Sequence, residues 1–204
     1  EIVAVVGRKA EGKSTLAAGI LGQIECSRGR VHVRGSVSYI AQTAFITNAS
    51  IRENILFGAP FDEKRYEKVI DACALGPDLK TMKAGDGTEV GERGVTLSGG
   101  QKQRVALARA AYADADVVVA DDPLSAMDAH VALHVFKKCF RGLLRSKSVL
   151  FLTNQINFAA SCDKIIFLDG GKASVGTYRE LCDASAAFAQ LAEYEVGSVD
   201  GGMV

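Results

Sequence analysis

The chain has 204 residues, of which 48% are hydrophobic and 24% are charged, a composition typical of a globular protein with a large buried core. Its 24 basic and 24 acidic side chains cancel, which argues against a broad nucleic-acid-binding surface, so we expect no nucleic-acid partner. The longest apolar runs, such as VVVA and IIFL, are far shorter than the roughly 18 residues needed to cross a bilayer, so this chain is not expected to span one.

The chain opens on a predicted strand, because Ile2 to Val6 form a short continuous apolar run typical of a strand buried on both faces. Since such a strand normally lies inside a sheet, we expect a fragment or a product truncated at its N-terminus. A glycine-rich turn follows, and residues 14–24 repeat apolar side chains at helical spacing. Residues 31–42 alternate around Arg34–Gly35 and predict a β-hairpin.

The middle of the chain is predicted to be helical. Asp62 is expected to open a helix, and Gly76–Pro77 is expected to end it. The predicted buried stripe of that helix consists of Tyr66, Val69, Ile70 and Cys73. Residues 80–96 are polar and glycine-rich, which predicts a loop, and a further helix is predicted to begin at Ser98.

Strands alternate with helices in the second half of the chain. Strands are predicted for DVVVAD, SVLFL and KIIFLD, and a helix for residues 126–145, while Thr177 and Glu180 form a capping-box pattern. This alternation implies right-handed crossovers and a parallel sheet. We therefore predict an α/β fold with a core of residues 1–49 and 113–196, a helical insert of residues 50–112 and a disordered tail of residues 197–204.

The stretch GRKAEGKST, which we call the phosphate loop (residues 7–15), lies between the first predicted strand and helix. Its spacing of Gly-x4-Gly-Lys-Ser matches a pattern that holds nucleotide phosphates when it follows a strand and opens a helix. Backbone N–H groups point at the phosphates in such loops, Lys13 adds positive charge, and the Ser14 hydroxyl suits Mg²⁺. The predicted nucleotide-binding residues are Gly7, Arg8, Lys9, Ala10, Glu11, Gly12, Lys13, Ser14 and Thr15.

A carboxylate ends the apolar strand VVVAD. In proteins with this kind of phosphate loop, an acidic residue at the carboxyl end of a parallel strand holds the Mg²⁺ ion. Asp121 takes that place in this sequence. We therefore expect Lys13, Ser14 and Asp121 to converge on a magnesium-bound nucleoside triphosphate.

A third stretch, LSGGQKQR, is called the signature segment here (residues 97–104). Ser98 is expected at a helix start, where Gly99 and Gly100 leave backbone N–H groups open to the approach of a second body. The segment resembles the signature of ATP-binding-cassette (ABC) ATPases. That resemblance implies contact with the ATP of a partner domain by Leu97, Ser98, Gly99, Gly100 and Gln101.

Other stretches carry the same resemblance from Ile2 to about residue 180. Gln42, Asp128 in SAMD and Asn154 in LTNQ stand at the places of the Q-loop glutamine, the D-loop aspartate and the switch histidine. The longer matches SIRENILFG and GERGVTLSGGQKQR are similar to the first nucleotide-binding domain of multidrug-resistance-associated (C-subfamily) transporters. The resemblance implies a RecA-like P-loop NTPase core with an inserted ABC-type helical subdomain.

The resemblance also implies cofactors and partners. Family members bind ATP with Mg²⁺, and two cassettes pair head to tail so that each ATP lies between the phosphate loop of one and the signature of the other. Closure and opening of this dimer drive the transmembrane domains of the same transporter, at the cytosolic face of a membrane. By resemblance, Ser14, Gln42 and Asp121 hold the metal, and Asp122, Asn154 and Gln42 serve ATP hydrolysis coupled to export.

Two departures from the family pattern predict slow hydrolysis at this chain's own phosphate loop. Asp122 stands where hydrolytic members have Glu as the base, and it is one methylene shorter, although a base must come within about 2.6–3.2 Å of the proton it takes. Asn154 replaces the switch histidine; its amide donates a hydrogen bond but carries no proton charge near neutral pH.

Further departures predict weaker binding that nevertheless survives. Family members have Gly at the place of Ala10, and a positive φ there would cost roughly 1–2 kcal/mol. Glu11 brings a negative charge toward the phosphates, whereas Arg8 and Lys9 bring two positive ones. The family's adenine-stacking aromatic residue lies upstream of the loop and has no counterpart in this sequence, and such stacking is worth roughly 1–3 kcal/mol.

Two alternatives stay open at this point. Asp122 and Asn154 also fit a regulatory nucleotide-binding module that does not turn ATP over. A soluble ABC protein acting on ribosomes or DNA is the other alternative, but the sequence lacks the inserts or coiled coils typical of such proteins, and its neutral charge argues against it.

Overall fold

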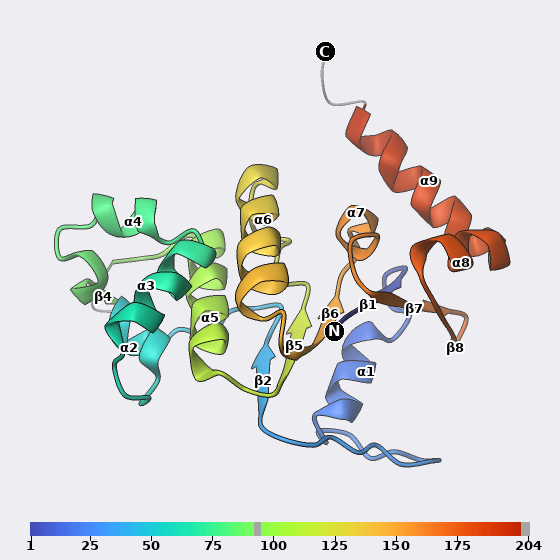
Figure 1. Ribbon diagram of the computed structural model, residues 1–204, viewed down its shortest axis with the longest axis horizontal. Coiled ribbons are helices and arrows are strands. Elements are labelled where there is room, and N and C mark those ends of the chain that lie inside the picture. Colours follow the sequence, from blue (N-terminus) through green and yellow to red (C-terminus); the bar gives the residue numbers. More distant parts are fainter. Residues whose placement is uncertain (92–94, 201–204) are drawn as a thin grey trace. The chain divides into compact units, whose positions relative to one another are not determined.

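The computed structural model describes residues 1–91 and 95–200 (Figure 1), and the chain divides into two compact units. The terminal unit contains residues 1–34 and the chain from Leu150 onward, and the central unit contains residues 35–149. This division differs from the predicted boundary at residues 50 and 112. The reason is that β2 pairs with β5 and Gln103 Nε2 donates to Ala41 O (3.1 Å), so strands expected in the core group with the helical segment.

The terminal unit is built on a mainly parallel sheet in the strand order β6-β1-β7-β8. Its strands are β1 (Ile2–Gly7), the end of β6 (Ser148–Leu152), β7 (Lys164–Asp169) and β8 (Lys172–Gly176). β1 pairs parallel with β7, and β7 pairs antiparallel with β8. Ala4, Val5 and Val6 are fully buried, which confirms the prediction of a buried first strand.

The helices of this unit are α1 (Lys13–Ile20), α7 (Ile156–Ala159), α8 (Tyr178–Ala184) and α9 (Ala186–Asp200). The predicted capping box at the start of α8 is confirmed, because the Thr177 side chain accepts from Glu180 N and the Glu180 carboxylate accepts from Thr177 N. α9 continues through residues 197–200, which were predicted as a disordered tail. A nucleated helix gains one hydrogen bond for each residue added, so a polar end can remain helical. Residues 201–204 of that predicted tail lie outside the described residues.

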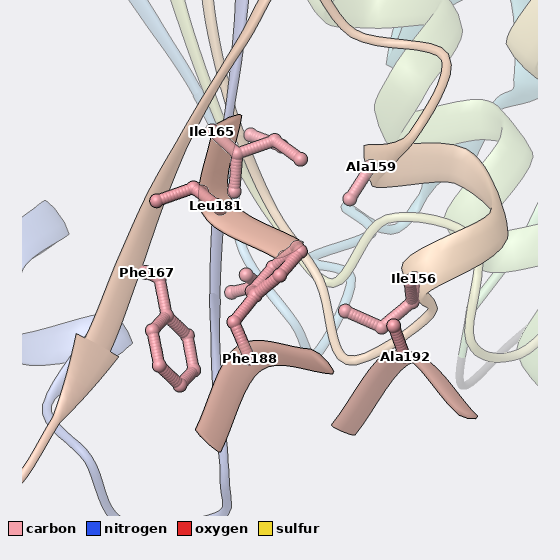
Figure 2. Packing of buried hydrophobic residues seen from close by; sticks show 9 residues of the cluster. Ile156, Ala159, Ile165, Phe167, Leu181, Phe188 and Ala192 are labelled. Carbon is pink, nitrogen blue, oxygen red and sulfur yellow. The ribbon is translucent and has the colours of Figure 1, made fainter. Parts of the chain in front are cut away.

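One hydrophobic cluster joins the sheet of the terminal unit to its C-terminal helices (Figure 2). Phe188 of α9 is fully buried and meets Phe167 of β7 edge-on, with ring centroids 5.3 Å apart. Ile156 and Ala159 of α7 line the same cluster. Since each large buried side chain contributes roughly 1.5–3 kcal/mol, this cluster fixes α7 and α9 to the strands that carry the phosphate loop.

The central unit has strand order β2-β5-β6, with the start of β6 included. β2 (Val37–Ile40) runs parallel to β5 (Val117–Asp121), and β3 (Ala49–Ser50) pairs antiparallel with β4 (Glu89–Val90). The predicted hairpin over residues 31–42 is therefore wrong. The partner of β2 is β5 rather than residues 31–34, where Val31 remains 48% exposed. The predicted α/β class with parallel strand pairs is confirmed.

The helices of the central unit are α2 (Ile51–Leu56), α3 (Glu63–Ala72), α4 (Gly76–Thr81), η1 (Gly85–Gly87), α5 (Gly99–Ala113), α6 (Ala129–Val135) and the π-helix η2 (Phe136–Leu143). Asp62 caps α3 by accepting from Arg65 N (2.9 Å), as predicted. Gly76–Pro77 opens α4 instead of ending α3, because proline needs no N–H partner in a first helical turn. Among the described residues, every helix is too short or too polar to cross a bilayer.

Candidate functional site

The phosphate loop connects β1 to α1, as predicted. Gly12 lies at φ 90°, a conformation that favours glycine, and α1 begins after it without any side-chain cap. A side chain at Gly7 would bring its Cβ within 2.6 Å of Leu168 O on the neighbouring strand β7. The two glycines of the pattern therefore allow a sharp turn beside β7, and the first N–H groups of α1, which have no acceptor within the helix, face the loop.

Lys13 lies folded over this loop. Its ammonium donates to the carbonyl oxygens of Gly7 (2.6 Å) and Arg8 (3.0 Å). The positive charge is thus held at the carboxyl end of β1, next to the N-terminus of α1, whose helix dipole has the same sign. This combination produces a local positive field suited to an anion.

Ala10 has φ 67°, in the left-handed region where an alanine is strained. The structure thus has at this position the positive φ whose cost was considered for an alanine in place of the family's glycine. The expected cost is roughly 1–2 kcal/mol relative to a glycine. The loop keeps its shape in spite of this local strain, which means that other contacts stabilise it.

Glu11 makes one such contact. Its Oε2 accepts a hydrogen bond from Gly170 N (2.9 Å), in the turn between β7 and β8. The sequence interpretation had this carboxylate approaching the phosphates. In the structure it is bonded to a backbone donor that lies 159 positions later in the chain, a partner that no local pattern could indicate.

Asn154 lies in the same unit, in the bend after β6. Thr153 N donates to Val5 O (3.0 Å), so the segment that follows β6 begins beside the end of β1. The half-buried Asn154 and the phosphate loop therefore follow neighbouring strands of the sheet. This arrangement is compatible with the predicted switch position.

Asp121 ends β5 in the central unit and is only 6% exposed. Burial of the Tyr39 phenol, with the nearby negative charge of Asp121 as the second cause, raises the pKa of Tyr39. Asp122 follows in the left-handed region at φ 48°, and its carbonyl oxygen accepts from Ser125 Oγ (2.9 Å). Asp121 and Asp122 thus follow each other at the end of β5. Asp121 is buried, and the backbone of Asp122 lies in a tight turn.

Gln42 is exposed in the segment that follows β2. β2 and β5 are parallel neighbours, with Ile40 opposite Ala120. The chain therefore leaves both strands at one edge of the sheet, which brings the segments that carry Gln42 and Asp121 together.

The signature segment opens α5 at the predicted residue. Ser98 is the N-cap, and its side chain accepts from Gln101 N (3.2 Å), while Gln101 Oε1 accepts from Ser98 N (2.9 Å). Gly99 is exposed, with open space around the position of a side chain. Leu97 is buried and anchors the start of the segment. The exposed first turn of α5 can thus be approached closely from outside.

Asp78 of α4 supports this segment and was missed by the sequence interpretation. Its two carboxylate oxygens accept from Gln101 Nε2 (2.8 Å) and Arg104 Nη2 (2.6 Å). The Asp78 and Arg104 side chains are only 17% and 11% exposed. One carboxylate therefore fixes both the capping glutamine and the next turn of α5. The only sequence signal was an acidic residue just after Gly76–Pro77, in the first turn of a short helix.

Asp128, predicted in the D-loop, is the N-cap of α6 and accepts from Val131 N (3.0 Å). The signature segment approaches this loop directly, because a Cβ at Gly100 would lie 2.8 Å from Ala126 O. The signature segment and the segment that precedes Asp128 are therefore packed against each other in the central unit.

The predicted site residues are distributed over both units. The terminal unit holds the phosphate loop and Asn154 after neighbouring strands, and the central unit holds Gln42, Asp121, Asp122, Asp128 and the signature segment. The convergence of Lys13, Ser14 and Asp121 involves both units and stays a prediction.

A phosphate loop between a buried strand and a helix, on a mainly parallel sheet, defines the class of P-loop nucleotide-binding proteins. Residues 1–125 match the family described as ABC transporter. Since that match covers more than half of the chain, the chain belongs to the ABC transporter family.

Curated relatives are similar to almost the whole chain. ABC transporter C family member 12 of Dictyostelium discoideum is 50% identical over 188 residues, which cover 92% of this chain and 14% of that protein. ATP-binding cassette sub-family C member 2 of Rattus norvegicus is 48% identical, covering 93% of this chain and 12% of that protein. ABC-type transporter cicA of Emericella nidulans is 47% identical, covering 94% of this chain and 14% of that protein.

These relatives confirm the predicted similarity to C-subfamily transporters. The chain spans 12–14% of the length of these relatives. Its assignment to the first of two cassettes stays a prediction.

Proposed function

We propose that this chain is an ATP-binding cassette that binds ATP and Mg²⁺ on its phosphate loop. The observation that carries the proposal is the uncapped N-terminus of α1, with the Lys13 ammonium held beside it by Gly7 O and Arg8 O. Ser14, Gln42 and Asp121 offer the oxygen ligands that Mg²⁺ prefers. When bound, the metal would neutralise phosphate charge.

The signature segment would serve a second cassette in a head-to-tail dimer. Its support is the capped and exposed first turn of α5, in which Gly99 and Gly100 present backbone N–H groups. Such a turn can stabilise the γ-phosphate of a partner's ATP, and this stabilisation ends when hydrolysis removes the phosphate. The dimer would then open.

Transmembrane domains are the second proposed partner, which puts the chain at the cytosolic face of a membrane. Support comes from the exposed aromatic side chains near Gln42, since Phe45 is 63% exposed and Phe57 is 59% exposed. A hollow beside Phe45 is also lined by Thr47 and Lys102. Large exposed apolar groups beside a hollow favour a protein interface. Export by the assembled transporter is proposed from the family alone.

Turnover at this chain's own phosphate loop is proposed to be slow. Asp122 is short for a general base, because its side chain has one methylene fewer than that of a glutamate. Asn154 cannot supply the charge of a histidine. With a second cassette supplied, Asp122→Glu should raise steady-state ATP hydrolysis at this loop if reach is the limit. An unchanged rate would assign the limit to Asn154 or to the loop.

A regulatory module that binds ATP without turnover is the second candidate, favoured by the same two residues. Single-turnover hydrolysis by the assembled pair of cassettes distinguishes them. A signal that disappears with mutation of Lys13 supports the slow ATPase, and a complete lack of hydrolysis at this loop supports the regulatory module.

Binding of ATP to the chain, with and without Mg²⁺, tests the central proposal. Lys13→Ala should weaken ATP binding by about 100-fold, because a charged phosphate contact is lost. Lys68→Ala, an exposed lysine of α3, is the matched control and should leave the affinity unchanged. Equal affinities in wild type and Lys13→Ala would exclude ATP binding by this loop.

A further inference from the structure

The hydrogen bond between Glu11 and Gly170 joins the phosphate loop to a rigid turn of the same unit. Asp169 pairs with Lys172 across the hairpin of β7 and β8, so Gly170 and Gly171 form a two-residue connection. Their φ values are 55° and 76°, as in the tight hairpin turns that match strand twist. The backbone donor at Gly170 is therefore held in a fixed direction by the sheet.

The same sheet brings that donor to the loop. β1 and β7 are parallel, with Gly7 opposite Leu168, so both chains leave the sheet at one edge. Gly170 lies two positions beyond Leu168, and Glu11 lies four positions beyond Gly7. The contact at 2.9 Å thus closes a ring between two adjacent strand ends.

The loop needs such a contact because Ala10 is strained. A non-glycine residue at φ 67° tends to relax to ordinary backbone conformations when nothing opposes it. Glu11 is the next residue, so anchoring its side chain restricts rotation about the Ala10–Glu11 segment. A protein that spends only part of its time in the binding conformation loses affinity in proportion.

We propose that Glu11 is a positioning residue for nucleotide binding. Its carboxylate accepts the hydrogen bond of Gly170 N–H and so keeps the phosphate loop in its binding conformation. The proposal rests on ATP binding by this loop. It assigns Glu11 a favourable effect on affinity, opposite in sign to the repulsion expected from an acidic residue beside phosphates.

Two substitutions in the full chain separate these effects. Glu11→Gln keeps an oxygen that can accept from Gly170 N but removes the charge, whereas Glu11→Ala removes both. Positioning predicts that Glu11→Gln binds ATP within about twofold of wild type, and that Glu11→Ala binds about three- to tenfold more weakly, the usual range for one lost hydrogen bond. Glu25→Ala, which removes an exposed acidic side chain elsewhere in the unit, should not change the affinity.

Amide hydrogen exchange at Gly170 gives a readout that needs no nucleotide. Glu11→Ala should speed exchange of the Gly170 amide about tenfold, and Glu11→Gln should preserve most of the protection. Thermal unfolding of each variant checks that the unit remains folded.

Other results would overturn the proposal. Tighter ATP binding in both Glu11 variants would show that repulsion dominates, and unchanged Gly170 exchange in Glu11→Ala would show that the hydrogen bond is not formed. Equal losses in both variants would assign the effect to charge instead of the contact. Lys13→Ala tests the proposed function separately. Unchanged ATP binding in Lys13→Ala would contradict ATP binding by the loop, whereas the Glu11 variants test only the positioning role of Glu11.

Discussion

The phosphate loop and the signature segment both open a helix after a short glycine-containing stretch, but they are stabilised by different means. α1 starts without a side-chain cap, behind a strained Ala10 at φ 67°. α5 starts at Ser98 in an extended conformation (φ −64°), with a reciprocal capping box and Asp78 behind it. Capping side chains satisfy N–H groups at the N-terminus of α5. No side chain caps α1, and the loop before it is held by the hydrogen bonds of Lys13 to Gly7 O and of Glu11 to Gly170 N.

This difference indicates which end depends on a ligand. The capping box of α5 satisfies the N–H groups of Ser98 and Gln101 before any partner arrives, so this helix end is rigid while Gly99 and Gly100 keep their N–H groups. An uncapped end with strain beside it gains more from an anion, because the anion satisfies donors that no side chain reaches. We therefore expect the signature segment to be preformed and the phosphate loop to gain stability on nucleotide binding.

The largest effect should come from removing Asp78. Asp78→Ala leaves Arg104 without its carboxylate in a mostly buried position and releases the Gln101 side chain, so the chain should lose about 2–3 kcal/mol of stability. Urea unfolding measures this loss. Asp71→Ala, an exposed position of α3, is the control and should change stability by less than about 0.5 kcal/mol. A loss equal to that of the control would mean that the signature segment is not held by its side chains.

Paired glycine substitutions test the packing of the signature segment. Gly100→Ala brings a Cβ within 2.8 Å of Ala126 O and should cost about 1–2 kcal/mol, while Gly99→Ala, with nothing within 4 Å, should be tolerated. The unfolding free energies of the two variants give the comparison directly. If both variants are equally stable, the approach of α5 to residue 126 is not tight.

Paired serine substitutions compare the two helix ends. Ser98→Ala removes the N-cap of α5 and should cost about 1 kcal/mol, as such changes usually do. Ser14→Ala lies in the uncapped first turn of α1 and should leave stability unchanged in the absence of nucleotide. Thermal unfolding checks both. An equal cost at Ser14 would contradict the contrast between the two regions.

The smallest effect is expected at the strained alanine. Ala10→Gly should stabilise the chain by about 0.5–1 kcal/mol, because relief of the left-handed strain exceeds the entropic cost of a glycine. Ala18→Gly, in the body of α1, should have the opposite sign and cost about 1 kcal/mol. Denaturant unfolding of the two variants gives the signs, and a loss at position 10 would show that its conformation carries no strain.

Local signals in the sequence predicted local structure well. The helix starts at Asp62, Ser98 and Thr177 follow from side chains three positions away from the N–H groups they cap. The strand that carries the phosphate loop follows from one apolar run. In each case the residues that decide the structure are neighbours in the chain.

Contacts between distant segments were not predictable in this way. The hairpin over residues 31–42 failed because β2 finds its partner in β5, about 80 positions away. Glu11 looked like a repulsive charge because Gly170 lies far along the chain, and Asp78 had no recognisable pattern. The sequence motifs identified the candidate site residues, but the contacts that support them depend on the folded chain.

The closeness of Gly100 to the Ala126 carbonyl has a mechanical consequence. Without a side chain between them, the first turn of α5 and the segment that ends in the Asp128 cap of α6 meet backbone to backbone. Backbone atoms in contact cannot yield by changing rotamer, so a push on one segment is transmitted to the other with little slack. A molecule that docks on the glycines of α5 and displaces its first turn would therefore also displace the start of α6.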